Sequence, residues 1–299
     1  MLAIVKTTLL RGVYVFSAIV LLAGCSAPVD VSDEPSAIAA SAPAPDQVWE
    51  GHVVASPLDL SLDEWKTPED LSWQAPEQST GSFDSDDVAS HAAFIQEYAE
   101  VASFSEDVLF AGDYDEAMDV VLSSIGESRH RAAYRELYTQ EDSPIGFATV
   151  LADDVTLWDE VRGHIEWKFE ETTAYDLPAL YGSVAVSSFF PVTVDGNQTW
   201  AFVMREYGLV STDPSVPEDA GFSFSYGYTW GGDRCGMEET NRLNGAAINA
   251  SQVEGLAQVA ESIADEGYTD REEVHDLMSK VSADSDEPDC SATTATASD

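Results

Sequence analysis

The basic side chains that could bind an anion gather in one short stretch of the chain. Arg129, His130, Arg131 and Arg135 form the only basic cluster after the N-terminal apolar run. In a helix, Arg131 and Arg135 lie on one face, and their planar guanidinium groups suit bidentate contacts with a carboxylate or a phosphate. The alternative is that these arginines form surface ion pairs with some of the 55 acidic residues of the chain.

A second candidate site is a row of aromatic residues. They alternate with small or polar residues at Phe222, Phe224, Tyr226, Tyr228 and Trp230, which predicts a strand with one aromatic face. Such a face stacks against a flat ligand or belongs to a core, and a soluble domain rarely exposes so much apolar surface. We therefore expect core or the lining of an enclosed pocket, with Tyr226, Tyr228 and Trp230 as ligand-binding candidates.

Standard catalytic and metal-binding motifs are absent from the sequence. It contains no Gly-x-Ser-x-Gly, Ser-x-x-Lys or His-Glu-x-x-His motif and no phosphate-binding loop. The absence of these motifs counts against an enzyme but does not exclude one, because catalytic triads are defined by geometry and not by sequence order. The histidines lack metal-ligand spacing, and we predict no metal and no cofactor. His91 is expected to be packed and hydrogen-bonded, and His164 to lie at the surface.

The N-terminus has the features of an export signal. Lys6 and Arg11 precede an apolar run, Gly12–Ala23, which is shorter than the ~20 residues that a membrane span needs. The run ends in Leu22-Ala23-Gly24-Cys25, which resembles the lipobox of bacterial lipoprotein precursors. The resemblance implies cleavage before Cys25 and a diacylglyceryl thioether on its sulfur. The alternative is an ordinary signal peptide followed by a chance cysteine.

A lipid on Cys25 would leave Cys235 and Cys290 as an even pair. In the non-reducing compartment that an export signal implies, a disulfide between them is the natural interpretation, the alternative being two unpaired thiols. Residues 25–47 are rich in Ala, Ser, Pro and acidic residues, which is typical of a flexible linker. We therefore predict a cleaved signal peptide at 1–24, a lipidated linker at 25–47, a single domain at 48–281 and an acidic tail at 282–299.

The chain is strongly acidic. It has 13 basic and 55 acidic residues and a formal charge of −42, and loss of Lys6 and Arg11 with the signal peptide leaves 11 basic residues and a charge of −44. Nucleic acid is not expected as a partner, because neutralising phosphates needs a basic face. The expected partners are the membrane, through the lipid anchor, and a small molecule or an envelope protein.

Hydrophobic periodicity predicts helices first, strands next and helices last. A period of 3.6 residues predicts a helix from Ser85, whose apolar stripe consists of Val88, Ala92, Ile95, Ala99 and Ala102. The same period predicts helices from about Asp113 to Gly126 and from about Ser128 to Tyr138. Alternation predicts strands over residues 161–169, 184–194 and 200–204, with a hairpin turn at Asp195-Gly196-Asn197-Gln198. Capping boxes predict two C-terminal helices, which open at Ser251-x-x-Glu254 and Thr269-x-x-Glu272.

Three tryptophans occupy an irregular segment before the first helix. Trp49, Trp65 and Trp73 lie within residues 48–78, which show no clear period. We expect this segment to wrap around the domain with its tryptophans packed on the core. The alternative is a surface on which sugars stack.

The order of elements predicts an α+β fold, in which N-terminal helices pack on an antiparallel sheet and a C-terminal helix pair follows. The segments Phe94–Tyr98 and Ala111–Ala117 resemble the helical opening of nuclear-transport-factor-like cone folds. The resemblance spans about residues 85–230 and implies a curved sheet that encloses a pocket. It identifies no catalytic residue, since the enzymes of that family differ among themselves.

Together these features predict an exported, membrane-tethered lipoprotein on the extracytoplasmic face of a cell membrane, whose domain binds a ligand or a protein. One alternative is a cell-envelope enzyme with its site near the basic cluster or near Tyr226–Cys235. Another is the solute-binding subunit of a transporter, against which the absence of βα repeats counts. A buried carboxylate against His130 in a cleft would favour the enzyme, and two lobes with a hinge would favour the transporter subunit.

Overall fold

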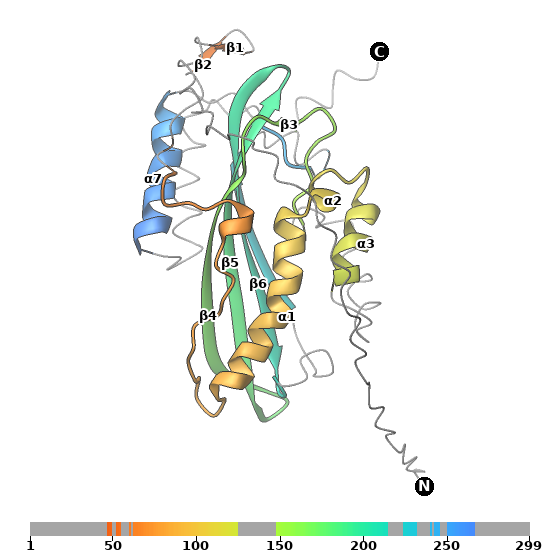
Figure 1. Ribbon diagram of the computed structural model, residues 1–299, viewed down its shortest axis with the longest axis vertical. Coiled ribbons are helices and arrows are strands. Elements are labelled where there is room, and N and C mark those ends of the chain that lie inside the picture. Colours follow the sequence, from red (N-terminus) through yellow and green to blue (C-terminus); the bar gives the residue numbers. More distant parts are fainter. Residues whose placement is uncertain are drawn as a thin grey trace, which may run out of the picture. The chain divides into compact units, whose positions relative to one another are not determined.

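The computed structural model describes residues 47–49, 52–54, 60, 62–124, 148–214, 224–231, 240, 242–245 and 250–266. All of them belong to one compact unit, Ala42–Asp299. They form helices on an antiparallel sheet, so the predicted α+β class is confirmed (Figure 1). The predicted third helix, the second C-terminal helix, the basic cluster Arg129–Arg135 and all three cysteines lie outside the described residues.

The first long helix, α1 (Ser85–Phe104), begins at the predicted residue. The Asp84 carboxylate accepts the backbone N–H groups of Asp86 and Asp87 at 2.9 and 3.0 Å, and the Asp87 carboxylate accepts the N–H of Asp84 at 3.3 Å. This capping box satisfies donors that the helix cannot pair internally. The predicted apolar stripe is buried along its whole length, at Val88, Ala92, Ile95, Ala99 and Ala102.

Two further helices extend the layer that α1 begins. The short α2 (Glu106–Leu109) follows α1 after one residue, and α3 (Tyr114–Ser124) follows α2. Hydrophobic periodicity does not indicate α2, because one helical turn is too short to show a period. The predicted second helix corresponds to α3, whose buried residues are Ala117, Met118, Val121 and Leu122.

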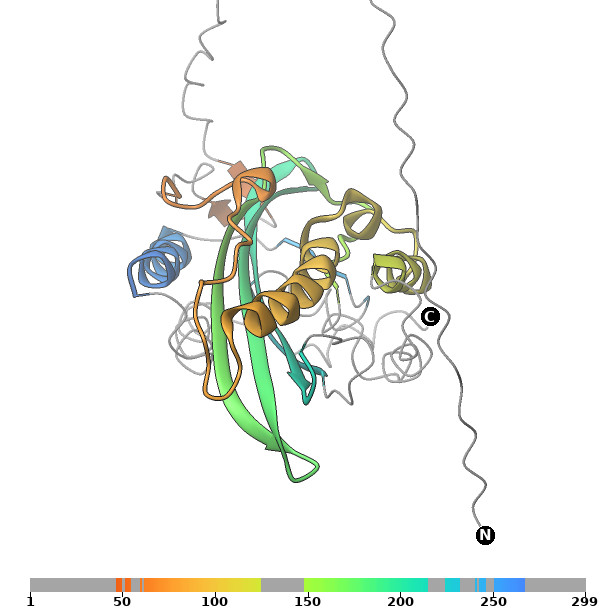
Figure 2. The ribbon, with the colours of Figure 1, turned by 60° about the horizontal axis from the view of Figure 1, so that its bottom comes forward.

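The sheet has five antiparallel strands: β3 (Thr156–Leu157), β4 (Arg162–Ala174), β5 (Leu177–Val194), β6 (Asn197–Ser211) and β7 (Phe224–Gly231). The strands β3 and β4 both pair with β5, which pairs with β6, and β6 pairs with β7. Figure 2 shows the long strands bending around α1. The predicted hairpin joins β5 to β6, where Asp195 and Gly196 have φ angles of 51° and 79°, as a type I′ turn requires.

Both faces of the central strands β5 and β6 are buried along most of their length. One face lies under α1, whereas α7 (Ala250–Glu266), the first predicted C-terminal helix, covers the other (Figure 1). The adjacent residues Phe189 and Phe190 point to opposite faces, and both are buried. Phe189 packs in a cluster with α7 residues such as Leu256 and Ile263. Helices on both sides of β5 and β6 therefore account for the burial of both faces of these strands.

The segment before α1 packs on the sheet as expected. Trp65 and Trp73 are both buried, and the Trp65 Nε1–H donates to the carbonyl of Ala260 in α7 at 3.3 Å. These two residues are therefore core and not a sugar-stacking surface. His164 was expected at the surface, but it is half-buried, with its ring centroid 5.8 Å from that of Trp65. Burial lowers the pKa of His164.

Short elements complete the N-terminal part. The irregular stretch contains a small hairpin, β1 (Gln47–Trp49) and β2 (His52–Val54), and a 3-10 turn, η1 (Pro68–Asp70), none of which the periodicity indicated. Lys66 forms an isolated antiparallel bridge with Gly163 at the start of β4, with N–H···O distances of 3.0 and 2.7 Å. The chain then follows β4 toward the start of α1 (Figures 1 and 2), so it shields the edge of the sheet.

Candidate functional site

The most unusual buried residue of the described part is Arg205, in the middle of β6. It is only 2 % exposed and lies opposite Val186 on the face that α1 covers. Its Nε–H donates to Thr149 Oγ1 at 3.1 Å and its Nη2–H donates to the carbonyl of Ala148 at 2.7 Å. Thr149 is itself tied to α1, since its N–H donates to the carbonyl of Ala102 at 3.0 Å. Burying a guanidinium group costs free energy unless its N–H groups find acceptors, and here Thr149 and Ala148 supply them.

Tyr207 lies two residues further along the same face of β6. Its ring meets that of Tyr98 edge to face, with centroids 5.3 Å apart. Its hydroxyl is 2.9 Å from Ser103 Oγ, and either oxygen can be the donor. Burial raises the pKa of Tyr207 above its ordinary value, although the charge of Arg205 and the hydrogen bond with Ser103 oppose this. Tyr207 therefore acts as a neutral, positioned hydroxyl.

The backbone register brings the predicted aromatic strand beside these two residues. Tyr228 lies opposite Arg205, Tyr226 lies opposite Tyr207, and Trp230 lies opposite Val203. Cross-strand partners occupy the same face of an antiparallel sheet. The ligand-binding candidates of β7 are therefore at positions on the α1 side of the sheet, next to a buried cation and a buried phenol.

His91 is the third polar group between α1 and the sheet. It is fully buried, and its Nε2 lies 3.0 Å from the carbonyl oxygen of Leu209. The backbone approaches this ring closely at Gly182, where an added Cβ would lie 2.6 Å from His91 Cδ2. Burial lowers the pKa of His91 to about 4 despite the hydrogen bond with Leu209. The expectation of a packed, hydrogen-bonded histidine is confirmed.

Alternation explains why the sequence analysis missed Arg205. In β6, Trp200, Phe202 and Met204 share one parity and Arg205 the other, which is the solvent side if only one face of a strand is buried. Because α1 and α7 cover opposite faces, Arg205 is buried instead. The available signal in the sequence was a charged residue, Arg205, within a largely apolar strand. Whether such a residue is buried depends on whether helices cover one face of the strand or both.

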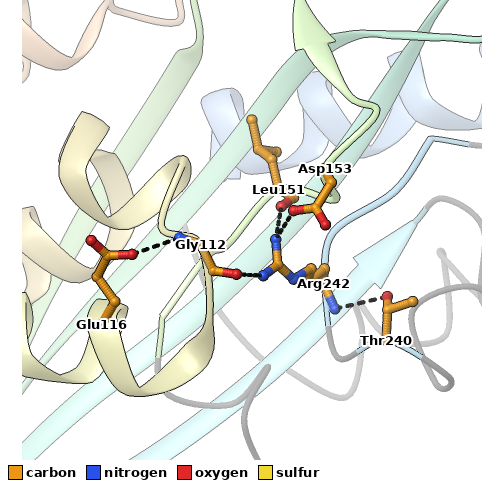
Figure 3. Close-up of polar contacts among 6 residues, drawn as sticks. All are labelled: Gly112, Glu116, Leu151, Asp153, Thr240 and Arg242. Carbon is orange, nitrogen blue, oxygen red and sulfur yellow. Dashed lines mark hydrogen bonds and ion pairs between the residues drawn. The ribbon is translucent and has the colours of Figure 1, made fainter.

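Arg242 is a second arginine that the sequence analysis did not single out (Figure 3). Its Nη1–H groups donate to the carbonyl of Leu151 at 3.3 Å and to Asp153 Oδ1 at 2.6 Å, and Nη2–H donates to the carbonyl of Gly112. The next residue, Leu243, bridges to Leu151 in parallel. Arg242 thus fastens the segment before α7 to the loop between α2 and α3. We assign it a structural role.

The remaining predicted site residues are not placed. The basic cluster Arg129, His130, Arg131 and Arg135, the lipidation candidate Cys25, and the pair Cys235 and Cys290 lie outside the described residues. Within the described ranges, no group of three or more His, Cys, Asp or Glu side chains is arranged to hold a metal ion. No helix in those ranges is both long and apolar enough to cross a membrane.

Comparisons with protein-family models, with curated proteins and with solved structures found no match. The similarities to bacterial lipoprotein precursors and to nuclear-transport-factor-like cone folds therefore stay predictions from the sequence.

Proposed function

We propose that the protein is an exported lipoprotein, tethered through Cys25 to the outer face of a membrane, and that its α+β domain binds a ligand or a partner protein there. The observation that carries the tether is the motif Leu22–Cys25 at the end of an apolar run with Lys6 and Arg11 before it. The Ala-, Ser- and Pro-rich stretch that follows suits a spacer between a lipid and a folded domain.

The geometry of the described residues is consistent with a binding role. His91 contacts a backbone carbonyl and His164 contacts Trp65, whereas His130, the histidine on which the enzyme alternative depends, lies outside the described residues. Arg205 and Tyr207 are fixed by hydrogen bonds beside the aromatic positions of β7, an arrangement suited to holding a ligand. All described residues belong to one compact unit, which favours a single binding module over a two-lobed transporter subunit.

The tether is tested by changing the cysteine that would carry the lipid. The full precursor is expressed in a bacterial host, and membrane and soluble fractions are separated with and without Cys25→Ser. We expect the wild type in the membrane fraction and the variant in the soluble exported fraction, because one thioether lipid is the only anchor proposed. Cys235→Ser is the matched control and should stay with the membrane. Membrane retention of Cys25→Ser would reject the tether.

The binding site is tested separately on the purified full chain. The probe is a defined panel of small carboxylates and aromatic compounds, and the readout is the midpoint of thermal unfolding. We expect at least one compound to raise the midpoint of the wild type but not that of Tyr228→Ala, since Tyr228 lies opposite Arg205. Phe110→Ser, at an exposed residue of the helical layer, is the control. The proposed binding site would be rejected if no compound raised the unfolding midpoint of the wild type. It would also be rejected if a compound raised the midpoints of Tyr228→Ala and Phe110→Ser equally.

A further inference from the structure

The end of β4 and the start of β5 form a two-stranded ribbon that leaves the rest of the sheet. β6 ends at Ser211, opposite Leu180. Beyond that point, Thr172 pairs with Ala179, Thr173 with Pro178 and Ala174 with Leu177. Residues 172–179 are termed the finger. Figure 2 shows its tip extending past the first turn of α1, so the finger reaches into solvent away from the helical layers.

The finger tip exposes two large apolar side chains. Tyr175 is 82 % exposed and Leu177 is 55 % exposed. Among the residues whose side-chain burial the structure describes, Phe110, at 53 %, is the one other large apolar side chain with such exposure. Two exposed apolar side chains on one turn give no packing stability to the fold, so their presence points to a contact outside it.

The backbone at the tip adds an independent observation. Tyr175 and Asp176 have φ angles of 53° and 63°, as the central residues of a type I′ turn do. The corresponding turn between β5 and β6 uses Asp195 and Gly196, which tolerate this conformation. A bulky tyrosine disfavours it. An exposed aromatic residue held in an unfavourable backbone conformation is a common mark of a functional contact.

The base of the finger is braced, so the tip is presented in a fixed orientation. Glu171 accepts hydrogen bonds from the backbone N–H and the hydroxyl of Ser82, the latter at 2.6 Å. A side chain at Gly81, which has a φ of 59°, would collide with Glu171. A rigid projection loses little conformational entropy when it binds.

We propose that the finger docks on a cationic protein surface that contains a pocket for the ring of Tyr175. Tyrosine is a frequent anchor of protein interfaces. Asp176 is exposed beside it, and the chain without Lys6 and Arg11 carries 11 basic and 55 acidic residues, so a basic partner is attracted over a long range. An anionic membrane surface is repelled by the same charge. This surface lies about 30 Å along β5 from the position opposite Arg205, and docking does not depend on the tether or on that site.

A photo-crosslinking amino acid, p-benzoylphenylalanine, tests the proposal in the full chain within cells that produce it. It replaces Tyr175 in one variant and Phe110, the other exposed aromatic residue, in the matched control. Irradiation should give a discrete protein adduct from position 175 and none from position 110. The adduct partner is then purified and titrated with the wild type, Tyr175→Asn and Phe110→Ser. Asparagine keeps the turn, so a folded protein should lose at least tenfold in affinity with Tyr175→Asn and nothing with Phe110→Ser.

Several results would overturn the proposal. The absence of an adduct at position 175, or equal adducts at positions 175 and 110, would each contradict it. An adduct with lipid alone would mean that the finger contacts a membrane and not a protein. Unchanged affinity of Tyr175→Asn would remove the tyrosine anchor. The affinity should also fall at least tenfold between 50 and 300 mM salt, because screening weakens attraction between exposed charges. A salt-independent affinity would reject the cationic partner.

Discussion

The Nε2 atom of His91 donates its hydrogen to the carbonyl oxygen of Leu209, 3.0 Å away. A carbonyl can only accept, so in the neutral ring the proton lies on Nε2 and Nδ1 carries a lone pair. That Nδ1 atom is buried without a hydrogen-bond partner among the described residues. Protonation would place a full charge in this apolar layer, next to Gly182 and the ring of Phe169. The joint between α1 and β6 is therefore sensitive to acid.

Acidification should destabilise the domain through His91. The pKa of His91 is about 4 in the folded chain against 6.5 for the free side chain. The stabilisation by the neutral ring is thus complete above pH 6.5 and is lost as the pH falls toward 4, because the unfolded chain binds the proton first. The loss between pH 7 and pH 5 should be about 2 kcal/mol. Urea unfolding at the two pH values measures it.

His91→Gln is the matched control, because the glutamine amide can donate to Leu209 without titrating. It should remove most of the pH-dependent difference, although other groups leave a background common to both proteins. An equal change in the free energy of unfolding for the wild type and His91→Gln would contradict the assignment.

The hydroxyl pair of Ser103 and Tyr207 should be energetically coupled. Tyr207→Phe and Ser103→Ala each leave one buried hydroxyl without its partner and should cost about 1 kcal/mol. The double variant should cost clearly less than the sum, since neither hydroxyl remains. Chemical denaturation of the four proteins gives the coupling free energy. In the control cycle, Tyr181→Phe combined with Ser103→Ala should be additive, because Tyr181 donates to Glu206 instead.

Arg242 should matter more than the acid with which it pairs. Asp153 is 86 % exposed, so Asp153→Asn should change the free energy of unfolding by less than ~0.5 kcal/mol. Arg242→Ala removes donors from the carbonyls of Leu151 and Gly112 and should cost about 2 kcal/mol. Hydrogen exchange should accelerate at Leu243, whose N–H donates to the carbonyl of Val150 at 2.7 Å. Equal losses of stability in both variants would mean that the ion pair with Asp153, and not the hydrogen bonds to the two carbonyls, holds this segment.

The finger turn should become more stable when its tyrosine is removed. Tyr175→Asn places a residue that tolerates positive φ at a position with a φ of 53°, so the free energy of unfolding should rise by about 1 kcal/mol. Thermal and chemical unfolding measure the change. Leu177→Ser, next to the turn, should be neutral within about 0.5 kcal/mol. Lower stability of Tyr175→Asn would show that the tyrosine supports the fold instead of an external contact.

The predicted disulfide between Cys235 and Cys290 can be tested by mass. The purified mature protein, alkylated without reduction, should carry no added group, and after reduction it should carry groups on both cysteines. Closure of the intervening loop should stabilise the chain by up to ~4 kcal/mol. Alkylation of both thiols before reduction would disprove the pairing.

The sequence predicted the elements in which local chemistry and burial agree. The buried stripe of α1 and the Asp195–Gly196 turn depend on neighbours in sequence, and both were confirmed. The capping residue of α1 is Asp84, one turn before Asp87, and this pair was within reach of the same reasoning.

Residues whose role depends on distant contacts were not predictable. Arg205 is buried because α1 and α7 cover opposite faces of β6, and no local sequence pattern reveals that arrangement. His164 is half-buried only because Trp65, almost one hundred positions earlier, lies against it. The register that brings Tyr228 beside Arg205 is also a property of the assembled sheet.

The late position of α7 in the chain has a consequence for folding. Trp65 donates to Ala260, 195 residues away, and the cluster beneath α7 contains Trp65, Phe189, Trp200 and Phe202. A chain that emerges N-terminus first exposes these aromatic rings until α7 has emerged. Assembly of this face is therefore among the slowest steps, since contacts of long sequence separation form slowly. Until then the strong negative charge of the chain opposes aggregation through these exposed rings.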